Sequence, residues 1–269
     1  MRRSASIFLV LFTFLTVAVP LAAQTTPPSS FVNLSIGHSG AVADITSHPS
    51  QALAFTVGDD GRLGVWDLST KNLYRRFQIS PHPITRITHH PSRNEIAMFI
   101  RERVGSGVIL AFNWETGEEI FRHQVDAIPT YLNYSPTGSY VVYATPSYQS
   151  LSFLASDTGD RRPYFENGFG VVGFVQMAQS ERNVMTYLPT RGEFVYWQVT
   201  TGDELQRVGT RARLQHLRVV DPETRRLLAA SDGSNLLIVD NLTGDVKATY
   251  PLAPIIGIQY DPESRLILV

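Results

Sequence analysis

Two adjacent histidines are the residues in this chain that most directly suggest chemistry. His89-His90-Pro91 offers two imidazoles, and imidazole is the commonest metal ligand in proteins. Neighbouring residues of a strand point to opposite faces, so the two rings are poorly placed to share one ion. His48-Pro49 stands at the equivalent place 42 residues earlier. The pattern therefore predicts turn residues of a repeat and no metal site.

Other catalytic patterns are missing or incomplete. The sequence has no G-x-S-x-G motif, so no serine nucleophile elbow is indicated. The glycine-rich stretch Arg103–Val108 precedes no helical pattern, so it offers no phosphate-binding helix N-terminus. The acid pairs Asp59-Asp60 and Glu118-Glu119 fall in predicted turns or an outer strand, where solvated carboxylates are expected. We therefore expect a protein that is not an enzyme and that holds no cofactor.

Composition narrows the class of protein further. The 269 residues include no cysteine, which excludes disulfides, thiolate catalysis and cysteine-based metal sites. Hydrophobic residues make up 43% of the chain, enough to bury a sizeable core. The formal charge is −1, and it is −3 without residues 1–23, which hold two arginines and no acid. This balance gives no electrostatic basis for binding nucleic acid or an anionic membrane.

Residues 1–23 have the layout of a secretory signal peptide. Arg2 and Arg3 precede an apolar run over 7–19, and the small residues Ala22 and Ala23 follow. A membrane span needs ~20 apolar residues, so this run predicts a cleaved leader and no membrane span after its removal. Residues 24–30 are predicted to form a flexible tether. Export without disulfides favours a bacterial periplasm or cell envelope.

A repeat of about 43 residues organises the rest of the chain. An apolar run ends in Thr followed by Gly or Lys at spacings of 46, 42, 43 and 42 residues, namely at Thr70, Thr116, Thr158, Thr201 and Thr243. Turns containing proline keep the same period, at Pro49, Pro91, Pro136, Pro222 and Pro262, with a degenerate copy at Ala178-Gln179. Two markers that stay in phase indicate a true structural repeat.

Each repeat has the pattern of four short strands joined by turn residues. In the first repeat the strands are expected over 41–46, 52–57, 63–68 and 73–79. Four-stranded units with this period predict an all-β fold, a β-propeller. The final "DPESRLILV" matches the first turn and second strand of a sixth repeat. We therefore expect a propeller over 31–269 with five complete repeats, C-terminally truncated from a seven-bladed ring, which residues 31–36 help to close.

The first repeat resembles a WD40 repeat. Residues 37–68 contain Gly37-His38, the turn "GDDG" and the pair Trp66-Asp67. The resemblance implies a hydrogen-bonded structural tetrad of His38, Thr56, Asp60 and Trp66. Later repeats depart from the pattern, because the Trp66 position becomes Phe112, Leu154, Trp197 and Val239. WD40 propellers present variable loops on a rigid ring, so the resemblance implies a non-catalytic platform that binds a protein or peptide partner.

The loops between second and third strands, and those between repeats, are expected to meet on one face of a propeller. Arginine and aromatic residues are common in binding hot spots. The candidate partner-binding residues in these loops are Arg62, Arg101, Arg103, Tyr148, Arg191, Arg211 and Arg213. Acids such as Asp59 and Glu102 share the same loops, and this mixed charge suits a protein partner better than phosphate.

Two alternatives stay open. Quinoprotein-type propellers also carry a D-x-x-T-G-like element, which "SDTGDRRPYF" and "VTTGDELQRV" resemble, and such a propeller would be an enzyme. Their repeats tend to place a Trp after Thr-Gly against a neighbouring blade, where this chain has Phe77, Phe121, Phe165, Val208 and Tyr250. The second alternative is a propeller that belongs to a longer protein with a C-terminal effector domain.

Overall fold

The computed structural model describes residues 37–146, 151–162, 171–221, 223–252, 254–261 and 264–269. The predicted signal peptide, the tether and the segment 31–36 lie outside these residues. Over the described ranges the chain forms strands β1 to β22 joined by turns. No helix in these ranges is long and apolar enough to cross a membrane.

The strands pair in sequence order into five four-stranded antiparallel sheets, called blades 1 to 5 here. Blade 1 comprises β1 (Val42–Ser47), β2 (Leu53–Gly58), β3 (Arg62–Asp67) and β4 (Asn72–Gln78). Blade 2 comprises β5 (Ile84–His89), β6 (Glu95–Arg103), β7 (Ser106–Asn113) and β8 (Glu118–Val125). Blade 3 comprises β9 (Tyr131–Tyr134), β10 (Tyr140–Ala144), β11 (Leu151–Ala155) and β12 (Arg161–Arg162).

The second half of the chain continues the same pattern. Blade 4 comprises β13 (Phe174–Met177), β14 (Asn183–Leu188), β15 (Glu193–Gln198) and β16 (Glu204–Gly209). Blade 5 comprises β17 (Gln215–Val219), β18 (Leu227–Ser231), β19 (Asn235–Asp240) and β20 (Val246–Pro251). A two-stranded sheet of β21 (Gln259–Asp261) and β22 (Leu266–Leu268) follows. The degenerate repeat at Ala178-Gln179 is therefore the first turn of a complete blade.

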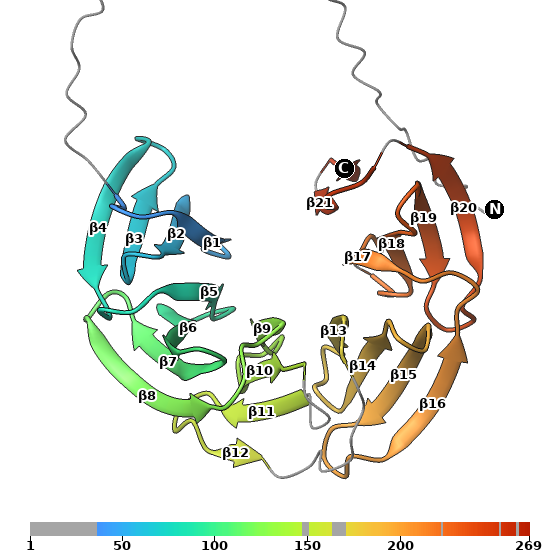
Figure 1. The fold of residues 1–269 in the computed structure, drawn as a ribbon, viewed down its shortest axis with the longest axis horizontal. Helices are drawn as coiled ribbons and strands as arrows, with labels where there is room; N and C mark the ends of the chain where they lie inside the picture. Colours follow the sequence, from blue (N-terminus) through green and yellow to red (C-terminus); the bar gives the residue numbers. More distant parts are fainter. Residues whose placement is uncertain (1–36, 147–150, 163–170, 222, 253, 262–263) are drawn as a thin grey trace, which may run out of the picture.

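The blades stand side by side in an arc (Figure 1). The first strands of the blades line its centre, and the fourth strands lie on its outer rim (Figure 1). An opening separates blade 1 from the β21–β22 sheet (Figure 1). The fold is thus an all-β propeller of five four-stranded sheets followed by a two-stranded sheet, which confirms the predicted fold class, whereas truncation from a seven-bladed ring stays a prediction. The four strands expected in the first repeat match β1 to β4 to within one residue.

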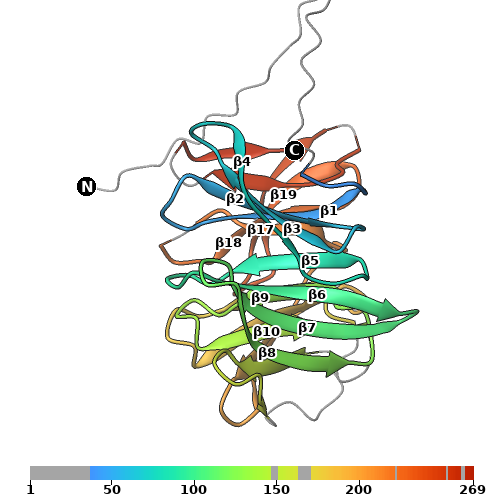
Figure 2. The ribbon, with the colours of Figure 1, turned by 90° about the vertical axis from the view of Figure 1, so that its left-hand side faces the viewer.

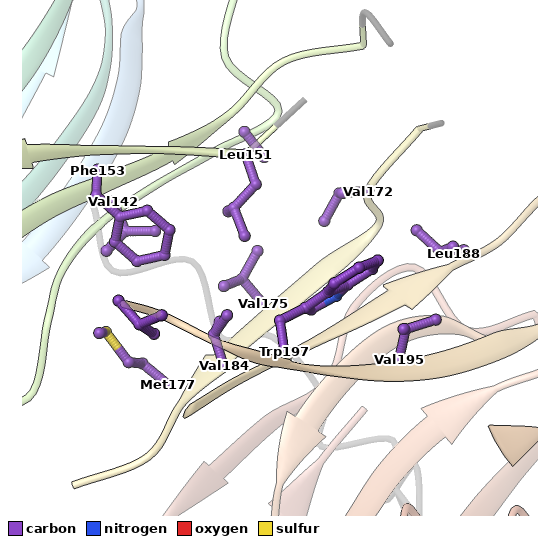
Figure 3. Close-up of a cluster of buried hydrophobic side chains, with 12 residues drawn as sticks. Val142, Leu151, Phe153, Val172, Val175, Met177, Val184, Leu188, Val195 and Trp197 are labelled. Atoms are coloured by element: carbon purple, nitrogen blue, oxygen red, sulfur yellow. The ribbon is translucent and has the colours of Figure 1, made fainter. Parts of the chain in front are cut away.

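The core lies between the blades, in five apolar clusters that follow one another along the arc. Figure 3 shows the cluster between blades 3 and 4, where Leu151 and Phe153 of β11 approach Val175 of β13 and Trp197 of β15. The last cluster joins blade 5 to the sixth sheet through Ile258. Each blade is therefore buried on both faces only where it has a neighbour on both sides.

The Thr-Gly repeat has a local backbone cause. The glycines of four repeats have φ values of +83° at Gly117, +73° at Gly159, +75° at Gly202 and +74° at Gly244. Glycine adopts this left-handed conformation without a steric penalty. The N–H of each glycine donates to the carbonyl four residues earlier, which closes the turn between the third and fourth strands. Lys71 takes the same place in blade 1 with φ +58°.

The turns between third and fourth strands also contact the preceding blade. A Cβ on Gly159 would lie 2.5 Å from the ring of Phe121, which comes from the outer strand of the preceding blade. The turn glycine Gly117 lies beside Phe77 in the same way, and Gly244 lies beside Val208. The outer-strand apolar residue of one blade thus packs on the Thr-Gly turn of the next.

Candidate functional site

The structure brings His38, Thr56, Asp60 and Trp66 together in blade 1. His38 Nε2 lies 2.8 Å from Thr56 Oγ1, and His38 Nδ1 lies 2.9 Å from Asp60 Oδ1. The Trp66 indole N–H donates to the same Thr56 hydroxyl at 2.8 Å. The four side chains are therefore joined by the hydrogen bonds that the WD40 resemblance implied. Their polar atoms are used within the blade, which makes this set a structural element.

The surroundings of the tetrad fix its charge and its shape. Burial alone would raise the pKa of Asp60, but hydrogen bonds from His38, from Ser39 N–H and from Arg62 N–H outweigh it and lower this pKa to about 2. Asp60 is thus held as a carboxylate, and its side chain is only 6% exposed, so it is a member of the tetrad and not the solvated turn acid that the Asp59-Asp60 pair suggested. Gly64 leaves room for the network, because a Cβ there would lie 2.9 Å from Thr56 Oγ1.

Blade 4 contains the tryptophan–threonine part of the same network, which the sequence analysis did not predict. The Trp197 indole N–H donates to Thr186 Oγ1 at 2.9 Å, and Thr186 is fully buried. The signal was present in the sequence, since Thr186 and Trp197 are 11 residues apart and Thr56 and Trp66 are 10 apart. A Trp–Thr bond between adjacent strands therefore recurs in two blades.

The two adjacent histidines face opposite neighbours. His89 lies against blade 1, with its ring centroid 4.5 Å from that of His48, and its Nε2 accepts from Trp114 at 3.3 Å. His90 faces blade 3, where its ring lies 4.9 Å from that of Tyr134. Burial lowers the pKa of each to about 4. Both rings are thus neutral parts of the contacts between blades.

His48 and His90 share a turn-forming role. The Nδ1 atom of His90 accepts the N–H groups of Ser92 and Arg93 at 3.1 and 2.9 Å. His48 Nδ1 accepts two N–H groups in the same way, from residues 50 and 51. Each imidazole closes the turn after its Pro, and this accounts for the histidine-proline repeat. Within the described residues, no three His, Asp or Glu side chains gather as ligands for a metal.

The candidate partner-binding arginines lie at strand ends on one side of the blades. Consecutive strands are antiparallel, so the turns between second and third strands and the connections between blades leave from the same end of the sheets, which we call the loop face. Arg101 and Arg103 end β6, Arg191 is in the β14–β15 turn, and Arg213 precedes β17; all four are exposed.

Of the remaining candidates, Arg211 is also exposed, in the same connection as Arg213. Arg62 is half-buried, and its Nε donates to Gln78 Oε1 at 3.0 Å beside the tetrad, so it is tied to the blade. The pKa of Asp245 is lowered mainly by its bond with Thr243, and Arg211 adds to this effect, so Arg211 lies beside the next blade's turn. Tyr148 lies outside the described residues. The candidate arginines come from blades 1, 2 and 4 and from the connection between blades 4 and 5, which lie at different places along the arc (Figure 1).

The blade geometry agrees with a comparison against known families. A family model described as an N-terminal beta-propeller domain, TP_0598_N, matches residues 23–257. The chain belongs to this family. A search of curated proteins finds no match.

The family assignment covers all five blades of this propeller domain. It establishes the β-propeller, whereas the resemblance to WD40 repeats rests on the tetrad of blade 1. The family description contains the word N-terminal, which implies longer proteins among its members, and it states no activity. Function must therefore be argued from the surfaces of the domain.

Proposed function

We propose that this propeller domain is a non-catalytic, WD40-like platform that binds a protein partner through its loop face. The observation that carries the proposal is the β6–β7 hairpin of blade 2. Its strands have nine and eight residues, against seven or fewer in the other blades that the structure describes. Figure 2 shows this hairpin extending beyond the neighbouring blades.

The tip of this hairpin has the composition of a binding hot spot. Val104 is fully exposed, with a relative exposure of 104%, and it sits between the exposed Arg103 and Gly105. Arg101 is exposed two residues earlier. An apolar side chain beside arginines on a rigid strand pair can bury area and form charge-assisted bonds at once. Gly105 has φ +82°, a conformation that glycine adopts readily in a tight turn.

Removal of charge from the hairpin tests the proposal. Arg101→Ala with Arg103→Ala should weaken binding of the partner from an envelope extract by about 30-fold or more, since hot-spot truncations cost about 2 kcal/mol or more. The matched control is Arg161→Ala with Arg182→Ala, because both residues are exposed and lie off the loop face. Equal capture by the hairpin variant and the parent would reject the loop face as the binding surface.

We also propose that the domain is exported into a bacterial envelope as the recognition part of a longer protein. Export rests on the leader pattern of residues 1–23, and the longer protein rests on the family description. Mass spectrometry of the protein recovered from cells, which identifies its first residue, tests export. A first residue at Gln24 is the result expected of a cleaved leader. A protein that retains Met1 in the cytoplasm contradicts export.

One observation favours the quinoprotein-type alternative. Phe121 packs on the Thr-Gly turn of the next blade, where the corresponding Trp of quinoprotein repeats is expected to lie against a neighbouring blade. An enzyme of this type would need a quinone, and its visible absorption would identify it. A purified full-length protein that shows this absorption would replace the platform proposal with an enzyme.

A further inference from the structure

A groove runs along the inner strands at the centre of the arc. It has a volume of about 660 Å³, and all residues of β9 and β13 line it. Arg86 of β5 borders one side, and Arg218 of β17 and Arg225 of the following turn border the other. Figure 1 shows these inner strands converging on the centre of the arc. Four blades therefore contribute to one concave site.

The groove carries concentrated positive charge. Three arginines line it, and no aspartate or glutamate of the described residues does so. Arg86 Nη1 donates to Thr85 O at 3.0 Å, and Arg218 Nη1 donates to Leu217 O at 2.8 Å. Each bond holds a guanidinium against its own strand and leaves further N–H donors for a ligand. Across the described chain, none of the three arginines forms an ion pair with a carboxylate.

The groove also offers apolar walls and a free acceptor. Phe174 and Val219 contribute apolar surface beside the amide of Asn133. Gln176 Nε2 donates to Arg225 O at 2.9 Å, which fixes the orientation of this amide. The buried Oε1 of Gln176 has no hydrogen-bond partner among the described residues. This atom can accept an N–H from a ligand, which a phosphate or a simple carboxylate lacks.

We propose that the central groove binds a carboxylate-bearing ligand, and that this ligand is an acidic peptide segment. The planar guanidinium matches a carboxylate through two parallel hydrogen bonds, which favours carboxylates presented by side chains. The apolar walls fit the peptide between its charges, and Gln176 Oε1 fits a backbone N–H. This site is separate from the β6–β7 hairpin, so the proposal does not depend on whether the loop face binds a partner.

The test measures binding of fluorescein-labelled hexaglutamate to the full-length protein by anisotropy. Arg86→Gln with Arg218→Gln should weaken binding by about tenfold or more, because the loss of a single hydrogen bond to a charged group lowers an affinity by about that factor. Arg161→Gln with Arg182→Gln removes the same charge from exposed positions outside the groove and should leave the affinity unchanged. Gln176→Leu should weaken binding of hexaglutamate while leaving that of citrate unaltered.

Several results would overturn the proposal. Equal affinity in the Arg86→Gln, Arg218→Gln variant and the parent would remove the groove as the site, provided that both proteins have the same melting temperature. Hexalysine binding as tightly as hexaglutamate would exclude charge recognition. Phosphate that competes as well as citrate would contradict carboxylate selectivity. Citrate that binds as tightly as hexaglutamate, with the same arginine dependence, would reject the peptide and assign the groove to small polycarboxylates.

Discussion

Trp66 and Trp197 occupy the same place in blades 1 and 4, and each indole N–H donates to a threonine on the adjacent strand. Trp197 is only 6% exposed, because blade 3 covers it. Trp66 is half-exposed, and Gly37 lies against its ring so closely that a Cβ there would collide with it. Among the described residues no other blade covers Trp66 as blade 3 covers Trp197, and the hydrogen bonds of the tetrad hold its ring within blade 1.

Loss of the Thr56 hydroxyl should destabilise blade 1. Thr56→Val leaves the Trp66 indole N–H and the His38 ring without their shared partner, which should lower the free energy of unfolding by about 1–3 kcal/mol. Urea unfolding followed by tryptophan fluorescence measures the change. Thr70→Val, in an exposed turn of the same blade, is the control and should have little effect. A Thr56→Val protein as stable as the parent would show that the network contributes nothing.

Asp60 should make the domain sensitive to strong acid. Its pKa is about 2 in the folded protein and 3.8 ordinarily, so the unfolded chain takes up the proton first as pH falls. The stabilisation is present above pH 3.8 and is lost as pH falls towards 2. Asp60→Asn should therefore flatten the decline in urea midpoint over this window, whereas the exposed Asp59→Asn should keep it. A decline of the same steepness in Asp60→Asn would contradict the role assigned to the carboxylate.

His89 should produce a second decline at milder pH. Its pKa is about 4 in the folded protein against 6.5 ordinarily, mainly because the ring is buried, so the unfolded state binds the proton more readily between these values. Stability should fall as pH drops from 6.5 to 4. His89→Phe should reduce the slope in this window, whatever its effect at neutral pH, and His90 and His123, whose pKa values burial also lowers, should contribute to the slope that remains. The exposed His82→Phe serves as the control, and an unchanged slope in His89→Phe would be the opposing result.

Lys71 should be replaceable by glycine with a gain in stability. It adopts φ +58° where four other repeats have glycine, and this conformation costs an ordinary residue about 1–2 kcal/mol. Part of that gain is offset by the greater freedom of glycine in the unfolded chain, so Lys71→Gly should stabilise by about 0.5–1 kcal/mol. Thermal unfolding measures it, and Gly202→Lys should have the reverse effect. A lower melting temperature for Lys71→Gly would show that the side chain of Lys71 is needed.

Much of the fold could be predicted because its markers are local. Thr-Gly places a residue with positive φ between the third and fourth strands, and histidine-proline or its equivalent closes the turn between the first and second. Such turns depend on a few neighbouring residues, so they remain visible in sequence. Strict polar–apolar alternation is weak here, since Leu63, Gly64 and Val65 are all buried. Blades packed between neighbours bury both faces of their middle strands.

The candidate site was less predictable because it depends on contacts between blades. Arg86 and Arg218 are 132 residues apart and meet at one groove only because inner strands from different blades converge. Arg62 carries the same charge as Arg103, yet its contact with Gln78 ties it to blade 1. Projection of the β6–β7 hairpin depends on the pairing of Arg103 with Ser106 beyond a register shift. The 43-residue repeat in the sequence does not predict any of these three contacts.

The central claim is that the loop face contacts a protein partner, and site-specific photocrosslinking in cells tests it most directly. A photoreactive amino acid at Val104, on the tip of the β6–β7 hairpin, should form an adduct with a second protein. The same amino acid at Leu68 or Leu242, exposed in turns between third and fourth strands, should form none. An adduct from Val104 alone is the predicted result. No adduct from Val104, or equal adducts from all three positions, would contradict the account.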